Sequence, residues 1–104
     1  MIFLKIHETE HGAIIAMCDE KLIGNIYKDK KTETILDLKK YAEFYKGELL
    51  ETKTAIDVIK NISIYSGNIV GEESVSVIIK AGLADGSEIK KIDKIPSLHI
   101  YNIL

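Results

Sequence analysis

The sequence predicts an α/β (α+β) protein: a single small domain in which two to three helices pack on a mixed β-sheet that begins with an N-terminal hairpin. The chain has 104 residues, which fits one domain over residues 1–104. Hydrophobic residues make up 46% of the chain and charged residues 29%, as in an ordinary globular protein. Apolar runs of strand length precede and follow two segments with helical periodicity, which indicates helices packed on a sheet.

The first two strands are expected at residues 1–7 and 13–18. Apolar and other side chains alternate in the first, which is typical of a half-buried strand. A polar connection with Gly12 near its end predicts that the two strands form a β-hairpin. Residues 22–27 are a candidate third strand, in which Gly24 marks a bulge or a close backbone approach. The polar stretch that follows is expected to be an exposed loop.

Two helices are expected in the middle of the chain. Residues 35–38 form either a fourth strand or the start of a helix, and helical spacing predicts a short helix over residues 37–46 that ends at Gly47. The next helix is predicted from Thr54, which with Asp57 resembles a capping box. Its core stripe consists of Ala55, Ile56, Ile59 and Ile62.

The C-terminal part predicts an extended stretch around Gly67, a last helix and two final strands. The helix is expected from about Glu72 to Ala81, and Gly82 follows it as a left-handed C-cap with Leu83 folded back on the last turn. Its buried face consists of Val75, Ile78 and Ile79. The strands are expected at residues 87–92 and 98–103, with Pro96 at the break between them.

Composition excludes several classes of site and of protein. Cys18 is the only cysteine, so the chain forms no internal disulfide and no cysteine-based metal cage. The 14 cations are all lysines, and the net charge is −2, so no global attraction draws the chain to nucleic acid. No apolar run is long enough for a membrane span and no leader precedes a cleavage site. We therefore expect a complete cytoplasmic protein with no membrane association.

The order of elements over residues 66–83, a strand, a glycine and a helix, is that of many phosphate-binding loops. Here, however, Gly71 is followed at once by Glu72 and Glu73. Two carboxylates in the first turn complement the helix dipole and repel an incoming phosphate. The sequence therefore predicts a self-capped helix and not an anion site.

Nucleophilic and metal chemistry find little support in the sequence. A Cys18 nucleophile would need His7, His11 or His99 as its base, and nothing in the spacing brings them together. The neighbouring carboxylates raise a thiol pKa, so a half-buried structural cysteine is the preferred interpretation. His7 and His11 with Glu8 and Glu10 form a weak metal pattern on an expected exposed turn, and His99 is expected to be a hydrogen-bonded sheet residue. We expect no metal and no cofactor.

Aromatic side chains and lysines lie close together between residues 39 and 46. This aromatic–lysine cluster consists of Lys39, Lys40, Tyr41, Phe44, Tyr45 and Lys46. Aromatic faces beside lysines stack bases and neutralise phosphates, but the same spacing also describes a helix that packs its aromatic side on the sheet with solvated lysines. A second basic edge, formed by Lys80, Lys90, Lys91 and Lys94, is expected to face solvent.

Four short motifs occur in order over nearly the whole chain: "CDEKLIG" at 18–24, "FYKGE" at 44–48, "NIVGEESV" at 68–75 followed by "AGL" at 81–83, and "KIPS" at 94–97. Together they resemble the archaeal domain of unknown function 424 family. The resemblance implies a small single-domain α/β protein with no established activity, and it hints at an association with translation.

The family pattern, carried over to this chain, highlights a set of candidate ligand-binding residues. They are Cys18, Asp19, Phe44, Tyr45, Gly47, Glu48, Asn68, Gly71 and Glu72, together with Gly24. The pattern places a histidine directly after the proline, where this chain has Ser97, and a glycine where it has Lys94. Any role of that histidine is therefore in doubt here.

The leading hypothesis is a non-enzymatic binding module that contacts RNA or a component of the translation machinery. Lys39, Lys40, Tyr41 and Lys46 are the expected nucleic-acid contacts. The alternative is a small ligand-binding protein or enzyme whose site joins the segments Cys18-Asp19, Tyr45-Glu48 and Asn68-Glu72. A third hypothesis, a structural or oligomeric partner, requires an exposed apolar face or edge strand.

Overall fold

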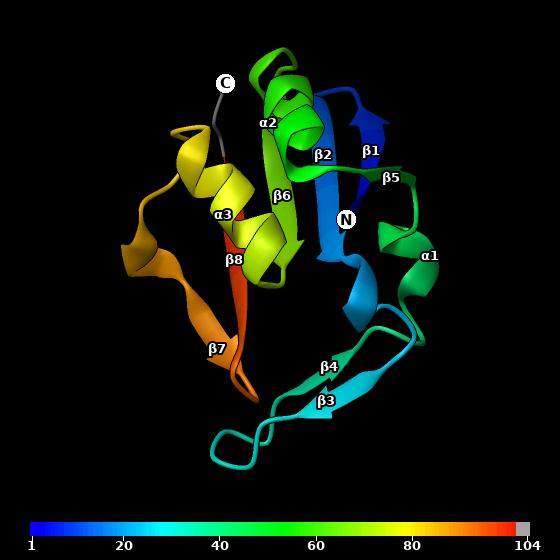
Figure 1. Ribbon diagram of the computed structural model, residues 1–104, viewed down its shortest axis with the longest axis vertical. Coiled ribbons are helices and arrows are strands. Elements are labelled where there is room, and N and C mark those ends of the chain that lie inside the picture. Colours follow the sequence, from blue (N-terminus) through cyan, green and yellow to red (C-terminus); the bar gives the residue numbers. More distant parts are fainter. Residues whose placement is uncertain (102–104) are drawn as a thin grey trace.

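A six-stranded mixed sheet in the order β5-β1-β2-β6-β8-β7 forms the centre of the computed structural model, which describes residues 1–101 (Figure 1). Its strands are β1 (Ile2–Thr9), β2 (Gly12–Asp19), β5 (Glu48–Leu50), β6 (Ile64–Val70), β7 (Lys90–Ile92) and β8 (Ile95–Tyr101). The strands β2 and β6 are parallel, and the other neighbours are antiparallel. A second, two-stranded sheet consists of β3 (Ile26–Lys28) and β4 (Ile35–Asp37). The predicted α+β fold class is confirmed.

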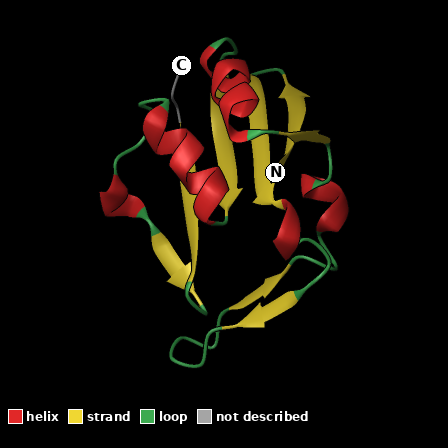
Figure 2. Ribbon diagram, in the orientation of Figure 1, coloured by secondary structure: helices red, strands yellow, loops and turns green. Residues whose placement is uncertain are grey.

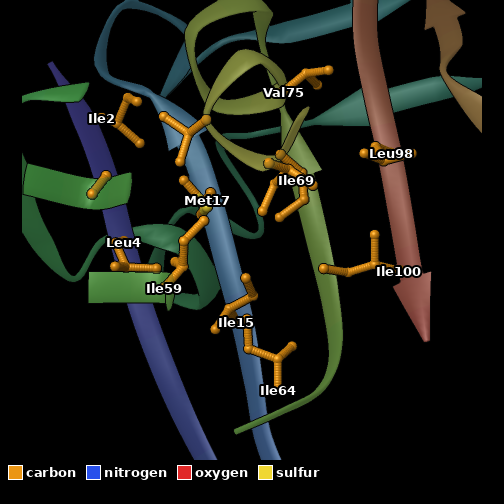
Figure 3. Packing of buried hydrophobic residues seen from close by; sticks show 13 residues of the cluster. Ile2, Leu4, Ile15, Met17, Ile59, Ile64, Ile69, Val75, Leu98 and Ile100 are labelled. Carbon is orange, nitrogen blue, oxygen red and sulfur yellow. The ribbon is translucent and has the colours of Figure 1, made fainter. Parts of the chain in front are cut away.

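The helices α2 (Thr52–Lys60) and α3 (Glu72–Lys80) lie side by side across one face of the sheet (Figure 2). Between them and the strands lies the main core, in which every second strand residue points toward the helices. Figure 3 shows this packing, in which the labelled residues are Ile2, Leu4, Ile15, Met17, Ile59, Ile64, Ile69, Val75, Leu98 and Ile100. Branched aliphatic side chains dominate the core, which suits both a strand face and a short helix stripe.

The other face of the sheet is covered by irregular elements. These are a one-turn helix α1 (Ala42–Tyr45), the β3–β4 hairpin and a 3₁₀ helix at Glu20–Leu22. A second, smaller core lies beneath them and consists of Ala16, Cys18, Leu22, Leu38, Tyr45 and Val70. In Figure 1 the hairpin projects away from the main sheet at the end of β2, next to α1. Because this cover is thin, the second face is the less completely packed one.

A buried carboxylate connects the two parts of the chain that form the parallel strand pair. Asp19, the last residue of β2, is fully buried, and its Oδ1 accepts hydrogen bonds from Ser74 N and Ser74 Oγ, both at 2.8 Å. Its Oδ2 accepts a hydrogen bond from Glu73 N at 3.1 Å. These donors stand in the first turn of α3, so Asp19 caps the helix from another strand. A Cβ on Gly71, whose φ is +106°, would overlap this carboxylate.

Several predicted elements are confirmed. The hairpin pairs Thr9 with Gly12, and the extended stretch around Gly67 is the single strand β6. The C-cap of α3 is left-handed as predicted: Gly82 has φ +76°, Gly82 N donates to Ile79 O at 3.0 Å and Leu83 N donates to Ile78 O at 3.2 Å. These two hydrogen bonds form a Schellman motif.

Other predicted elements are wrong in extent or position. Residues 22–27 are not one strand, because the chain turns at Gly24, with φ +90°, before β3 begins at Ile26. The helix predicted over 37–46 has a single turn, because Asp37 Oδ1 accepts hydrogen bonds from the backbone amides of Lys39 and Lys40 and holds a non-helical turn. The capping box at Thr54 is also wrong, since α2 begins two residues earlier and Thr54 lies inside it.

The last two strands also differ from the prediction. The break is a two-residue turn at Asp93 and Lys94, with φ +49° and +68°, and Pro96 lies inside β8. A turn with two left-handed residues matches the twist of a hairpin. Residues 102 and 103 of the strand predicted over 98–103 lie outside the described residues. The strand β5 has no counterpart in the sequence prediction.

The fold predicts a thermodynamic coupling between Asp19 and Gly71. Asp19→Ala should lower the free energy of unfolding by about 2–4 kcal/mol, because buried donors lose their acceptor. Gly71→Ala should cost at least about 2 kcal/mol through its backbone strain and the overlap with the Asp19 carboxylate. The double variant should lose less than the sum, because the overlap disappears with the carboxylate.

Urea unfolding followed by circular dichroism measures these free energies. Gly82→Ala is the matched control, because it also changes a glycine of positive φ but meets no neighbouring atom. It should cost about 1 kcal/mol and add independently to Asp19→Ala. Strict additivity of Gly71→Ala with Asp19→Ala would contradict the coupling.

Candidate functional site

A cavity of about 400 Å³ opens on the second face of the sheet, between β4, α1 and β6. Asn68 reaches it from β6, because its neighbour Ile69 points into the main core and successive strand residues point to opposite faces. The cavity is lined by Ile35, Leu36, Asp37, Leu38, Tyr41, Phe44, Tyr45 and Asn68. We call it the β4–α1 cavity.

The short helix α1 is held in place by two side chains of β1. Lys5 Nζ donates a hydrogen bond to Glu43 O at 2.7 Å, and His7 Nε2 donates to Phe44 O at 3.0 Å. The His7 ring also stacks on the Phe44 ring, with centroids 4.6 Å apart and an interplanar angle of 13°. Carbonyls at the end of a helix attract such donors. The aromatic wall of the cavity is therefore fixed from the main sheet.

The chain segment that leads into α1 carries two lysines, followed by an exposed aromatic ring that lines the cavity. The turn held by Asp37 places Lys39, Lys40 and Tyr41 consecutively before α1. Both lysines are exposed, Tyr41 is 54% exposed, and Lys40 Nζ lies 5.5 Å from the centroid of the Tyr41 ring. A solvated cation next to an accessible aromatic face can contact a phosphate while the ring contacts a base.

The side-chain amide of Asn68 and the hydroxyl of Tyr45 both belong to the lining, and neither has a hydrogen-bond partner among residues 1–101. Asn68 is half-buried and Tyr45 is buried. Burial, and secondarily the neighbouring Cys18, raises the pKa of Tyr45 to about 12, so its hydroxyl stays protonated at neutral pH. A mainly apolar cavity with a few free polar groups is typical of a ligand site.

Cys18 lies beneath this cavity in the second core. It is fully buried, in contrast to the half-buried position predicted, and its thiol donates to Asp19 O at 3.5 Å. Burial, and secondarily the charge of Asp19, raises the pKa of Cys18 to about 12. A protonated thiol without access to solvent is a poor nucleophile.

A second cavity, of about 180 Å³, lies at the ends of β2 and β6. It is lined by Asp19, Lys21, Leu22, Gly71, Glu72, Lys94, Ile95 and Pro96. Its position beside the N-terminus of α3 corresponds to that of a phosphate loop. The Asp19 carboxylate already accepts from the amides of Glu73 and Ser74, which a phosphate would need.

The cap of α3 therefore differs from the one predicted. Glu72 and Glu73 were expected to cap their own helix, but Glu72 is exposed and Glu73 Oε1 lies 3.5 Å from the N-terminal amine of Met1. Asp19, 55 residues from Ser74 in the chain, supplies the hydrogen bonds. The prediction that a carboxylate complements this helix end holds, but the residue responsible comes from another element.

The structure divides the predicted site residues among several places. Phe44, Tyr45 and Asn68 line the β4–α1 cavity, whereas Asp19, Gly71 and Glu72 line the second cavity. The other predicted residues contact neither cavity. Gly47 allows the chain to pass against β1, where a Cβ would overlap Leu4 O, and Glu48 is an exposed residue of the edge strand β5. Cys18 is buried between the cavities.

Sequence reasoning missed the β4 residues as part of a site. Ile35 and Asp37 line the cavity, and Ile35 is 60% exposed although it is a large apolar residue. The available signal was an apolar run next to a turn-forming aspartate, and that signal equally described the start of a helix. Among the expected nucleic-acid contacts, Tyr41 lines the cavity, Lys39 and Lys40 are exposed and precede it in the chain, and Lys46 is exposed just beyond α1.

The remaining candidates have structural surroundings. Among residues 1–101, no group of three metal-ligating side chains is present. His99 Nδ1 lies 2.8 Å from the Tyr101 hydroxyl, as expected of a hydrogen-bonded sheet residue. The lysines of the predicted basic edge, Lys80, Lys90, Lys91 and Lys94, are all exposed. None of the helices in the described part of the chain has the length and apolar character that crossing a membrane requires.

The structure defines a small α+β protein in which two of the cavities, the β4–α1 cavity and the one beside α3, are lined by predicted site residues. The family model "Protein of unknown function (DUF424)" matches residues 6–103, and the chain belongs to this family. It is also similar to an uncharacterized conserved protein from Methanopyrus kandleri, whose crystal structure superposes with a TM-score of 0.81. The two chains are 30% identical, and the match covers 97% of this chain and 90% of that one. No curated protein matches this chain.

The burial of Cys18 predicts an inert thiol. In the native protein at pH 8, Cys18 should react with Ellman's reagent at least about 100-fold more slowly than in urea, because only an exposed thiolate attacks the disulfide of the reagent and releases its coloured thiolate. The absorbance of the released thiolate measures both rates. A Ser87→Cys variant, which adds an exposed thiol, should show one fast and one slow phase. Equal rates in native and unfolded protein would contradict the assignment.

Proposed function

We propose that this protein is a non-enzymatic binding module that takes an unpaired base of single-stranded RNA into the β4–α1 cavity. The observation that carries the proposal is one cavity with an aromatic wall and a free amide, next to which two exposed lysines directly precede the lining residue Tyr41 in the chain. A base is flat, has apolar faces and carries donors and acceptors on its edge. Proteins that recognise single-stranded RNA stack such bases on aromatic rings and bond their edges.

The side chains of the cavity match these requirements in position. Tyr41 and Phe44 offer aromatic surface, and the Asn68 amide offers one donor and one acceptor to a base edge. Lys39 and Lys40 are exposed and directly precede Tyr41 in the chain, so the phosphates of a strand bound at Tyr41 would pass near them. Because the chain has a net charge of −2 and no arginine, we expect modest affinity that depends on these local lysines and on salt.

The buried polar groups favour binding over catalysis. The Asp19 carboxylate accepts three hydrogen bonds and has no exposed surface, so it is poorly placed to act as a general base. The Cys18 thiol is protonated and enclosed. The alternative, one site joining Cys18-Asp19, Tyr45-Glu48 and Asn68-Glu72, is disfavoured because these segments line two separate cavities or none.

RNA binding is tested with a fluorescein-labelled, unstructured RNA of ten nucleotides of mixed sequence, and with total tRNA and rRNA as competitors. Fluorescence anisotropy over a salt series should give binding at low ionic strength that weakens as salt rises, with a log–log slope of about −1.4 if two phosphates are neutralised. Absence of salt-dependent binding at low ionic strength would overturn the proposal.

Two matched sets of variants locate the site. The pair Lys39→Ala and Lys40→Ala should weaken binding and flatten the salt slope, whereas Lys90→Ala and Lys91→Ala should not, although both pairs remove two adjacent exposed lysines. Tyr41→Ala should weaken binding by about 5- to 100-fold through lost stacking. Tyr101→Ala, which removes an exposed tyrosine outside the cavity, should have no such effect. Equal effects of both sets would place binding elsewhere.

A further inference from the structure

We infer that the β4–α1 cavity selects a base with an exocyclic amino group, namely adenine, cytosine or guanine, and discriminates against uracil. This inference rests on the proposed function and names the ligand class of the same site. It follows from one side chain that the proposed function does not otherwise use, Asp37 at the end of β4.

The two oxygens of Asp37 have different surroundings. Oδ1 accepts hydrogen bonds from Lys39 N at 3.1 Å and from Lys40 N at 2.8 Å, which fixes the orientation of the carboxylate. Oδ2 has no hydrogen-bond partner among residues 1–101. The side chain is half-buried and lines the cavity. A carboxylate only accepts hydrogen bonds, so Oδ2 is an oriented acceptor that is open to water and available to a donor from a ligand.

Asn68 lines the same cavity from another element, since it belongs to β6 whereas Asp37 belongs to β4. Its amide carries one acceptor and two donor hydrogens, so it adapts to any base edge and does not choose among bases by itself. The Tyr45 hydroxyl is similarly adaptable. The carboxylate is the one group of the lining whose hydrogen-bond polarity is fixed, and the choice of base therefore depends on it.

The four bases differ in what they present to a carboxylate. Adenine and cytosine each carry an amino group next to a ring nitrogen acceptor, and guanine carries an amino group next to a ring N–H. Uracil has one ring N–H between two carbonyls. If this N–H donated to Oδ2, the carbonyls on both sides of it would lie against the carboxylate and repel it, whereas an amino group has such an acceptor on at most one side. Donation to a carboxylate, as from the cytosine amino group, is an established form of base recognition.

Cytosine and uracil form the sharpest pair of probes, because their rings have equal size and stack similarly. Oligo-rC and oligo-rU of ten nucleotides are compared by anisotropy at the same low salt concentration. The wild-type protein should bind oligo-rC at least about tenfold more tightly. Asp37→Asn should reduce or invert this ratio, because it keeps an acceptor for the turn and places an amide donor where Oδ2 stood.

Asp29→Asn is the matched control for this variant. Asp29 Oδ1 also holds a turn, through the amides of Lys31 and Thr32, but Asp29 does not line the cavity. This variant should leave the ratio unchanged, and the far-ultraviolet circular dichroism and melting temperature of both variants report whether the turns persist. Salt-dependent binding with equal affinity for both oligomers, a preference for oligo-rU, or an unchanged ratio in Asp37→Asn would overturn the inference and leave the proposed function standing. Absence of binding to either oligomer would overturn both.

Discussion

The hydrogen bonds between the Asp19 carboxylate and the first turn of α3 are the constraint on which the arrangement of this protein depends. They join the end of β2 to the helix that follows β6 and so fix the two parallel strands at the same end. A buried carboxylate is tolerable there because three donors and the positive end of the helix dipole replace its hydration. The chain accommodates the carboxylate only because Gly71 has no side chain. The loop that resembles a phosphate-binding loop thus holds an anion that belongs to the protein itself.

The thin cover on the second face of the sheet follows from the packing of both long helices on the first face. Both long helices cover the face that carries the branched aliphatic core, which leaves the other face to a one-turn helix and a short hairpin. These elements need side-chain contacts to hold them, and Lys5 and His7 provide such contacts for α1. The hairpin is held at its loop by Asp29, whose Oδ2 accepts a hydrogen bond from Asp93 N at 3.1 Å. This hydrogen bond is the first of the causes that lower the pKa of Asp29. A cover of this kind leaves the unfilled space that becomes the β4–α1 cavity.

The local parts of this structure could be predicted from the sequence, and the long-range parts could not. Strand alternation in β1, helical periodicity in α3 and the C-cap at Gly82 are properties of a few neighbouring residues, and they appear as predicted. The strand β5 forms because Gly47 lets the chain approach β1, which no local pattern encodes. The cap of α3 comes from 55 residues away. The sequence likewise did not predict the β4–α1 cavity, because its lining comes from a turn residue, a one-turn helix and a strand that are separate in the chain.

The residues highlighted by the family pattern separate into two groups once their contacts are known. Asp19, Gly47 and Gly71 each satisfy a requirement of the backbone or the core, and Lys94 adopts, with φ +68°, the left-handed conformation that would favour the glycine of the pattern. Such residues explain why members of the family share a fold, and they require no shared ligand. The second group of highlighted residues has no such role in the backbone or the core.

Asn68 belongs to this second group, because its amide faces the β4–α1 cavity without a partner among residues 1–101. Ser97, which stands where the pattern has a histidine, does not line this cavity, so the departure from the pattern leaves the site intact. A half-buried amide that bonds nothing contributes little to folding, because it gives up part of its hydration and gains no hydrogen bond in return. In the proposed function, the edge of a base would replace the water that this amide contacts in the aromatic-walled cavity.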